Sequence, residues 1–258
     1  LPPLAGEVKA LICPHAGYIY SGQTAAYAYS LVQGKSYETV IVIGPSHRYG
    51  FDGCSIYPKG GFETPLGVTE VDDDLAALIA KKSGFSYIAA AHKEEHSIEV
   101  QVPFIQKVLA GTKIVPIVMG YPTRKTISAL ADGLAEALAA KKTLIVASTD
   151  LSHYLSKEEA KATDSETISL VQRLETATLI NKLARGENIM CGGGPVVSAL
   201  LALKKRGQPK VEVLHYSDSS GFGGPIVGYL AAAITLEGSP PPQFSLSPEE
   251  KKELLLLA

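Results

Sequence analysis

Short apolar runs recur along this sequence and alternate with longer segments in which apolar residues fall at helical spacing. Runs without polar interruption are typical of strands that are buried on both faces of a sheet. The runs that predict such strands are 8–12, 38–44, 113–119 and 143–148. The segments that predict helices are 23–31, 72–82, 92–109, 126–140, 157–185 (one or two helices) and 196–205.

Strands that alternate with helices predict a layered α/β domain with a largely parallel central sheet flanked by helices. The runs 211–216 and 226–234 predict two further strands that close this sheet. The segments 54–57 and 67–70 lie between Gly and Pro residues and predict edge strands or a hairpin. Pro116 lies inside an apolar run, which favours an edge position or a bulge because proline cannot donate a ladder hydrogen bond.

The sequence contains no internal repeat and no linker that would divide it into two domains. We expect one α/β domain over residues 1–238 and, over 239–258, a Pro-rich connection that leads to a short C-terminal helix at 248–257. A chain of 258 residues is long enough to bury one sizeable core.

Composition restricts the classes of partner. The hydrophobic fraction is 46% and the charged fraction 19%, as in ordinary globular proteins. A net charge of -2 gives no basic field, so we expect neither nucleic acid nor an acidic membrane surface as partner. Three widely spaced cysteines do not suggest a disulfide framework. We find no signal peptide and no apolar run that could span a bilayer, and therefore expect a cytoplasmic protein.

Histidines follow three of the predicted strands directly. His15 and His47 come just after the first two runs, and His153 follows the run 143–148, with Asp150 three residues earlier. Because the carboxyl ends of parallel strands meet at one edge of a sheet, these side chains are expected to converge there. Imidazole nitrogens suit Fe, Zn or Cu. The pattern favours a shared metal site over three independent structural histidines.

Cys191 is the natural candidate to join the histidines. It precedes three glycines and the start of a helix, a position that favours the thiolate, which is the metal-binding and nucleophilic form. The alternative is a buried, inert cysteine. Cys13 and Cys54 fit that alternative better, because they lie in strand-like runs.

Residues 92–96 also match the pattern H-x-x-E-H of inverted zinc peptidases. On a helix His92 and His96 would share one face, but no further ligand follows downstream. We favour the interpretation that Glu95 and His96 line the rim of the strand-end site and that His92 faces solvent.

Five segments in order, between about residues 8 and 234, resemble the Memo family, whose prokaryotic members are the B component of the AmmeMemoRadiSam system. They are Pro14-His15-Ala16-Gly17-Tyr18, Gly44-Pro45-Ser46-His47, Glu95-His96-Ser97-Ile98-Glu99, Ser148-Thr149-Asp150-Leu151-Ser152-His153 and Cys191-Gly192. That family is similar in fold to the class III extradiol ring-cleaving dioxygenases. The resemblance therefore implies a central sheet between helical layers, like that of the extradiol dioxygenase B subunit.

The resemblance also implies roles for single residues. His15 and His47 would be metal ligands, and Cys191 falls where the dioxygenases place a carboxylate ligand. His153 would match their catalytic acid/base, with Asp150 beside it at the metal, where both are candidate ligands as well. His96 would line the same pocket. A thiolate in place of a carboxylate shifts the preference from Fe(II) toward Cu(I) or Zn, so ring cleavage does not follow from the resemblance.

The sequence thus favours a mononuclear metal site, with Fe(II) or Cu ahead of Zn, and redox or oxygen-dependent chemistry on a small molecule. The resemblance suggests a radical SAM protein and an AMMECR-type protein as partners. Two alternatives remain open. One is a metal-free thiol enzyme with Cys191 as nucleophile, His153 as base and Asp150 orienting it. The other is a non-catalytic module that binds a peptide or protein.

Overall fold

The computed structural model describes residue 4 and residues 6–237. Its strands are β1 (Glu7–Cys13), β2 (Thr39–Pro45), β3 (Cys54–Ile56), β4 (Gly61–Thr64), β5 (Gly67–Glu70), β6 (Lys113–Met119), β7 (Thr143–Ser148), β8 (His153–Leu155), β9 (Gln208–Asp218) and β10 (Ile226–Glu237). Its α-helices are α1 (Gln23–Ser30), α2 (Asp73–Ser83), α3 (Ala89–His92), α4 (Val102–Val108), α5 (Arg124–Ala140), α6 (Lys157–Gln172), α7 (Thr176–Ala184) and α8 (Gly193–Lys204). The short turns η1 (Tyr18–Gly22), of π type, and η2 (Glu99–Gln101) and η3 (Ser219–Phe222), of 3-10 type, complete the order.

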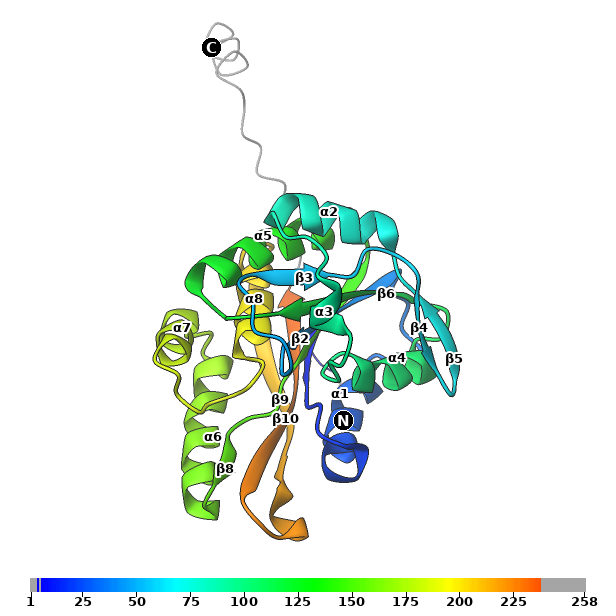
Figure 1. The fold of residues 1–258 in the computed structure, drawn as a ribbon. Coiled ribbons are helices and arrows are strands. Elements are labelled where there is room, and N and C mark those ends of the chain that lie inside the picture. Colours follow the sequence, from blue (N-terminus) through cyan, green and yellow to red (C-terminus); the bar gives the residue numbers. More distant parts are fainter. Residues whose placement is uncertain (1–3, 5, 238–258) are drawn as a thin grey trace, which may run out of the picture.

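The central sheet has the order β3-β6-β2-β7-β1-β10-β8, with β9 paired to β10 (Figure 1). Strands β6, β2, β7 and β1 run parallel, whereas β3, β10, β8 and β9 pair antiparallel with their neighbours. The predicted α/β class is confirmed: the middle of the sheet is parallel and the antiparallel strands extend it on both sides. Strands β4 and β5 form a separate hairpin.

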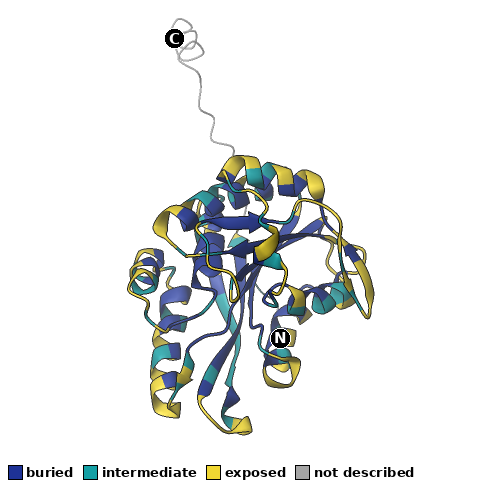
Figure 2. Ribbon diagram, in the orientation of Figure 1, coloured by how far each residue is buried: buried dark blue, intermediate teal, exposed yellow. Residues whose placement is uncertain are grey.

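Helices cover both faces of this sheet, and its strands are buried between them (Figure 2). Successive residues of a strand point to opposite faces. Ile41 and Ile43 accordingly belong to one core cluster, which includes side chains of α2, α5, α7 and α8. Val40 and Val42 belong to the other, which includes side chains of α1 and α4. β2 is buried along its whole length.

The parallel strands β1, β2 and β7 end within one residue of the same level. Cys13 at the end of β1 pairs with Ser148 at the end of β7, and Ile43 of β2 pairs with Ala147. At the opposite end of the sheet, Glu7 at the start of β1 pairs with Leu236 near the end of β10. The loops that follow β1, β2 and β7 therefore leave the sheet at one edge.

The predicted helix over 92–109 is wrong in its first part. Residues 93–98 are not helical, and a helix resumes only with η2 and α4. Pro103 lies in the first turn of α4, where its missing N–H is tolerated, so it marks a helix start rather than a kink. Before it, the backbone N–H of Ser97 bonds to the Glu95 carboxylate instead of continuing a helix.

The edge position or bulge predicted from Pro116 is also wrong, because β6 lies between β3 and β2 and pairs with both without a shift of register. The N–H and C=O of one strand residue point to the same side, and the Pro116 carbonyl accepts from the Tyr57 N–H on the β3 side. The last pair of the β3 ladder is Ile56 with Ile117. The Pro116 nitrogen therefore also points to the β3 side, just past the last pair of the β3–β6 ladder. Its missing N–H costs no hydrogen bond to β2.

The other strand and helix predictions are confirmed to within a few residues, and segment 157–185 forms two helices, α6 and α7. The predicted Pro-rich connection and C-terminal helix over 239–258 lie outside the described residues. Among the helices that the structure describes, none combines the length and the apolar character needed to cross a bilayer.

Gly44 allows the segment around Ser97 to pack against the end of β2. A Cβ at Gly44 would lie 2.2 Å from Ser97 Oγ, well inside van der Waals contact. Ser97 Oγ donates to the carbonyl of Pro45, the next residue. Glycine is therefore required at this position for the close approach of the two backbones.

We expect Gly44→Ala to lower the free energy of unfolding by about 1–3 kcal/mol, because the added methyl group overpacks a buried contact. Urea denaturation followed by circular dichroism measures the change. Gly221→Ala is the matched control, since a Cβ there meets nothing within 4 Å. Equal stability of the two variants would contradict the close-approach argument.

Candidate functional site

Three of the predicted site residues occupy equivalent places in the sheet. His15, His47 and Asp150 each lie two residues beyond the end of their strand, β1, β2 and β7 respectively. Since these strands end level, the three side chains reach the same edge. Cys191 comes from the loop before α8, which packs against the end of β7.

His15, His47 and Cys191 meet at one point. One ligand atom from each lies within 4.8 Å of the others. Cys191 Sγ is 3.2 Å from His15 Nε2, and the two imidazole rings lie nearly perpendicular, with centroids 5.2 Å apart. The His15 side chain is buried, whereas that of His47 is 29% exposed, so the group is open on the His47 side.

The Cys191 thiol is packed against the backbone after β7. The Asp150 N–H donates to Cys191 Sγ at 3.3 Å, and the Cys191 N–H donates to the Asp150 carbonyl at 3.2 Å. Gly192 makes this approach possible, because a Cβ there would lie 2.2 Å from the Ser148 carbonyl oxygen.

Burial raises the pKa of the Cys191 thiol to about 12, and the negative charge of Asp150 acts in the same direction. The expectation that the glycines and the helix start favour the thiolate is therefore wrong for the metal-free protein. Desolvation outweighs the N–H donors at this depth. A bound cation would reverse the balance, because a coordinated thiol loses its proton.

Asp150 holds the turn after β1. Its Oδ1 accepts from the backbone N–H groups of His15 (2.9 Å) and Ala16 (3.3 Å). Its Oδ2 lies 4.0 Å from His15 Nε2. Burial raises the pKa of the Asp150 carboxyl, with the two N–H donors and the nearby histidines opposing that effect.

His153 begins β8 and pairs with Val227 of β10. Its backbone is clamped by the Asn188 side chain, which accepts from the His153 N–H and donates to its carbonyl. Its Nδ1 lies 2.8 Å from the Leu151 carbonyl oxygen. Among the described residues, His153 is not in the group whose ligand atoms converge, which consists of His15, His47 and Cys191.

Glu95 and His96 lie beside His47. Glu95 Oε1 is 2.9 Å from His47 Nδ1, and its Oε2 accepts from the His47 N–H. The His96 ring lies 4.8 Å from that of His47 and 5.6 Å from that of His15. Burial raises the pKa of Glu95, but hydrogen bonds from His47 and Ser97 outweigh it and lower that pKa to about 2.

His92 does not face solvent as the sequence suggested. Its Nε2 lies 2.9 Å from Ser55 Oγ and its ring packs against Tyr57, with centroids 5.1 Å apart. Burial lowers the pKa of His92 to about 4. Because residues 93–98 are not helical, His92 and His96 share no helix face, and in the described residues it is His47, not His92, that groups with Glu95 and His96. The zinc-peptidase pattern is therefore fortuitous.

Sequence reasoning missed three buried residues behind His15. His15 Nδ1 lies 2.9 Å from Ser148 Oγ, and Gln101 Nε2 donates to that oxygen at 2.8 Å. Tyr29 donates its hydroxyl proton to Gln101 Oε1 at 2.9 Å. The available signal was a glutamine on the apolar face of a predicted helix, beside Ile98 and Val102.

The loops around this edge of the sheet carry exposed large apolar side chains. The loops follow β1, β2 and β6 and connect β9 to β10, and the short strand β8 carries one further such side chain. These residues, which we name the aromatic rim, are Tyr18, Ile19, Tyr20, Tyr49, Tyr121, Tyr154 and Phe222. Tyr20 and Phe222 contact each other across two of the loops, with ring centroids 4.7 Å apart.

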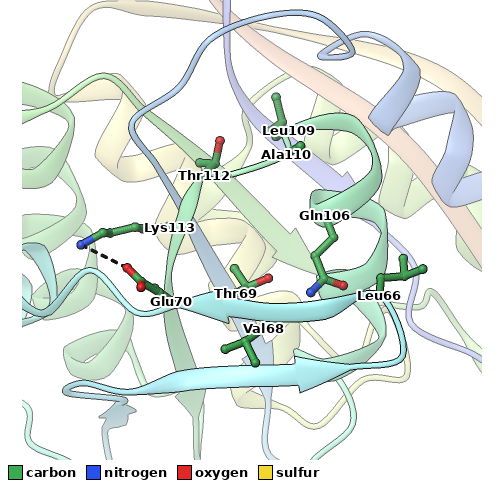
Figure 3. A pocket seen from close by; sticks show the side chains of 10 residues that line it. Leu66, Val68, Thr69, Glu70, Gln106, Leu109, Ala110, Thr112 and Lys113 are labelled. Carbon is green, nitrogen blue, oxygen red and sulfur yellow. Dashed lines mark ion pairs between the residues drawn. The ribbon is translucent and has the colours of Figure 1, made fainter.

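A separate hollow of about 490 Å³ lies between the β4–β5 hairpin and the end of α4 (Figure 3). Its Gln106 donates to the Gly67 carbonyl and accepts from Thr64, and Glu70 pairs with Lys113 at 3.7 Å. Lys113 begins β6, so this hollow is at the other end of the strand from the candidate centre. Gln106, Glu70 and Lys113 are thus already engaged, and the lining contains none of the predicted site residues.

Comparison with known proteins gives a consistent family. The model of the family described as Memo-like protein matches residues 2–233. MEMO1 family proteins are 35% identical over 230 residues in Methanothermobacter thermautotrophicus (86% of this chain, 83% of that protein) and 38% identical over 239 residues in Pyrobaculum aerophilum (89% and 84%). A crystal structure of an uncharacterized protein from Escherichia coli K12 matches with a TM-score of 0.52 at 14% identity, over 86% of this chain and 99% of that one. This structural likeness concerns the fold alone.

We expect His92→Ala to leave the metal content of the purified protein unchanged and to lower its free energy of unfolding by about 1 kcal/mol, because a partly buried hydrogen bond to Ser55 is lost. Elemental analysis and urea denaturation measure the two effects. A loss of metal from this variant would restore the zinc-peptidase interpretation of residues 92–96.

Proposed function

This chain belongs to the Memo-like family, and from that premise we propose that it binds one metal ion through His15, His47 and Cys191. The observation that carries the proposal is the convergence of two imidazoles and one thiol from three separate loops, with ligand atoms within 4.8 Å of one another. Unrelated side chains have no reason to meet in this way at the carboxyl edge of a parallel sheet, where ligands bind.

The donor set fits a first-row transition metal. Bonds of about 2.0–2.1 Å to nitrogen and about 2.3 Å to sulfur place donor atoms of one ion roughly 3 to 4 Å apart. The separation of 3.2 Å between Cys191 Sγ and His15 Nε2 fits that range. Two imidazoles and a thiolate suit Cu, Zn and Fe, and Asp150 or His153 would supply a further ligand. We place Fe(II) or Cu ahead of Zn.

We further propose metal-dependent redox or oxygen-dependent chemistry on a small molecule, with a radical SAM protein and an AMMECR-type protein as partners. Bound Fe(II) or Cu supplies one-electron chemistry at this position. The family resemblance supports the proposed partners and reaction class. The site supports the proposal only through its metal-donor atoms. His96 would line the substrate pocket beside His47.

Within this proposal His153 accepts and returns a proton. A carbonyl oxygen only accepts hydrogen bonds, so His153 Nδ1 donates to Leu151 and the lone pair lies on Nε2. A neutral imidazole with a free Nε2 is suited to general base chemistry near pH 7. Asp150 adds a negative charge beside the centre and orients the turn that carries His15.

The short contact between Cys191 Sγ and His15 Nε2 also favours a second candidate, a metal-free thiol enzyme. The geometry would make His15 the base in that case, in the place that the sequence analysis gave to His153. The raised pKa of the Cys191 thiol opposes this candidate, because the thiolate would be scarce at neutral pH.

The aromatic rim favours a third candidate, a module that binds a peptide or protein. Exposed aromatic side chains gathered on adjacent loops are enriched at protein interfaces. Such binding is compatible with a metal centre beneath the rim.

We expect Cys191→Ser and His15→Ala each to weaken metal affinity by more than the about 10- to 100-fold typical for loss of a supporting residue, because each removes a ligand. Elemental analysis of protein purified anaerobically without an affinity tag, and titration with Cu(I) and Fe(II), measure the change. Cys54→Ala is the control, since Cys54 is buried in β3. Unchanged affinity in both ligand variants would decide for the thiol enzyme.

We expect His153→Ala to keep the metal and to lose about 10²- to 10⁴-fold in turnover of a substrate, the usual contribution of a general acid or base. Metal content and steady-state kinetics separate the two effects. His215→Ala is the control, because His215 stacks on Tyr27 on another part of the surface. A loss of metal equal to that of His15→Ala would make His153 a ligand instead.

A further inference from the structure

The two histidines of the centre are supported by one short segment, Glu95–Ser97. We propose that this segment is a positioning element: it fixes both His15 and His47 with a proton on Nδ1, so that both present the Nε2 lone pair to the space beside Cys191. The purpose of this arrangement rests on the proposed metal centre. The inference itself concerns which ring nitrogen of each histidine carries the proton, and it can be tested in the metal-free protein.

The argument is direct for His47. Glu95 Oε2 accepts from the His47 N–H and Oε1 accepts from the Ser97 N–H at 2.8 Å. Both oxygens of Glu95 thus accept from backbone N–H donors, the hydrogen-bond pattern of a carboxylate, which only accepts. At 2.9 Å from Glu95 Oε1, His47 Nδ1 must be the donor. In the neutral imidazole the lone pair of His47 then lies on Nε2.

For His15 the assignment follows by elimination. Ser148 Oγ has one proton and three neighbours, His15 Nδ1 (2.9 Å), Gln101 Nε2 (2.8 Å) and the Ser97 carbonyl (2.7 Å). The carbonyl can only accept, so it takes the Ser148 proton. The hydroxyl oxygen is then left to accept from both nitrogens, and His15 Nδ1 carries a proton.

The elimination depends on the orientation of the Gln101 amide, and that orientation is fixed. Gln101 Nε2 also lies 2.9 Å from the Pro14 carbonyl oxygen, which can only accept. The opposite orientation would set two oxygens against each other there. On its other side, Gln101 Oε1 accepts from the Tyr29 hydroxyl.

The hydrogen bonds that fix the two histidines both involve the same three-residue segment, Glu95–Ser97. The Glu95 side chain holds His47, and the Ser97 carbonyl holds Ser148, which in turn holds His15. Glu95, Ser97, Ser148 and Gln101 are all buried, so these hydrogen bonds form in a low-dielectric interior where they are stronger. A carboxylate or hydroxyl on the outer nitrogen is the arrangement that orients histidine ligands toward a metal. The non-helical path of residues 93–98 follows from these bonds.

A competing interpretation uses the same atoms. His47, Glu95 and His96 also offer ligand atoms within 4.8 Å of one another, which is the geometry of a second metal site. A metal there would replace the proton on His47 Nδ1. The two interpretations differ in the tautomer of His47 and in the number of ions bound.

The test is long-range ¹H–¹⁵N spectroscopy of the metal-free protein, which distinguishes histidines protonated on Nδ1 from those protonated on Nε2. We expect both His15 and His47 to carry the proton on Nδ1. Glu95→Ala should allow the His47 proton to occupy either ring nitrogen and should leave the His15 proton on Nδ1. Ser148→Ala should allow the His15 proton to occupy either nitrogen and should leave the His47 proton on Nδ1. A merely structural role would not produce this crossed pattern. Glu94→Ala, at the exposed neighbouring carboxylate, and Ser198→Ala, at a buried serine in α8, are the controls.

Titration with Zn²⁺ supplies the second readout. Glu95→Ala and Ser148→Ala should each weaken Zn²⁺ binding by about 10- to 100-fold. Glu95→Gln, which keeps the side-chain volume, should fold even if Glu95→Ala does not, and should bind Zn²⁺ with an affinity between those of Glu95→Ala and the wild type.

A proton on Nε2 of His15 or His47 in the wild type would overturn the inference, whatever metal binds. Two Zn²⁺ ions per chain, one of them lost in Glu95→Ala, would also overturn it in favour of the second site. Correct tautomers together with a wild-type chain that binds no metal would instead refute the proposed function and leave the tautomer assignment standing.

Discussion

The parallel register of β1, β7 and β2 is the constraint on which the rest of the site depends. These strands are almost wholly buried, and a slip of one residue would turn every side chain to the opposite face of the sheet. The two faces pack against different helices, so a slipped strand would present side chains of the wrong shape to both core clusters, and the observed register places Cys13 beside Ser148. His15 and Asp150 then leave the sheet at the same level and His47 one residue farther along, so the packing of the core also determines where these polar side chains lie.

This constraint explains why much of the site could be predicted from sequence. A buried apolar run shows where a strand ends, and His15, His47 and Asp150 follow such ends directly. Both the α/β class and these positions can be predicted without knowing which distant residues are in contact. The path of the Glu95–Ser97 segment cannot. Helical spacing of the apolar residues after it suggested a continuous helix, but side-chain bonds to distant loops determine its path.

The protonation of Cys191 could not be predicted from sequence for a related reason. Adjacent glycines and a helix start suggested an environment that favours the thiolate, and both features are present. The thiol is nevertheless surrounded by the backbone after β7 and lies near Asp150, so desolvation and like charge dominate. Local sequence shows which donors are near a group, whereas burial depends on how the whole sheet packs.

The antiparallel pairing of β10 with β1 has a consequence for rearranging the chain. Glu7 and Leu236 are direct partners in the sheet, at the end remote from the loops that carry His15, His47 and Asp150. Joining two such neighbouring positions through a short peptide would not stretch the fold, and new ends can be opened in a surface loop elsewhere. The fold is therefore suited to circular permutation, and a domain attached at either position would leave the aromatic rim exposed.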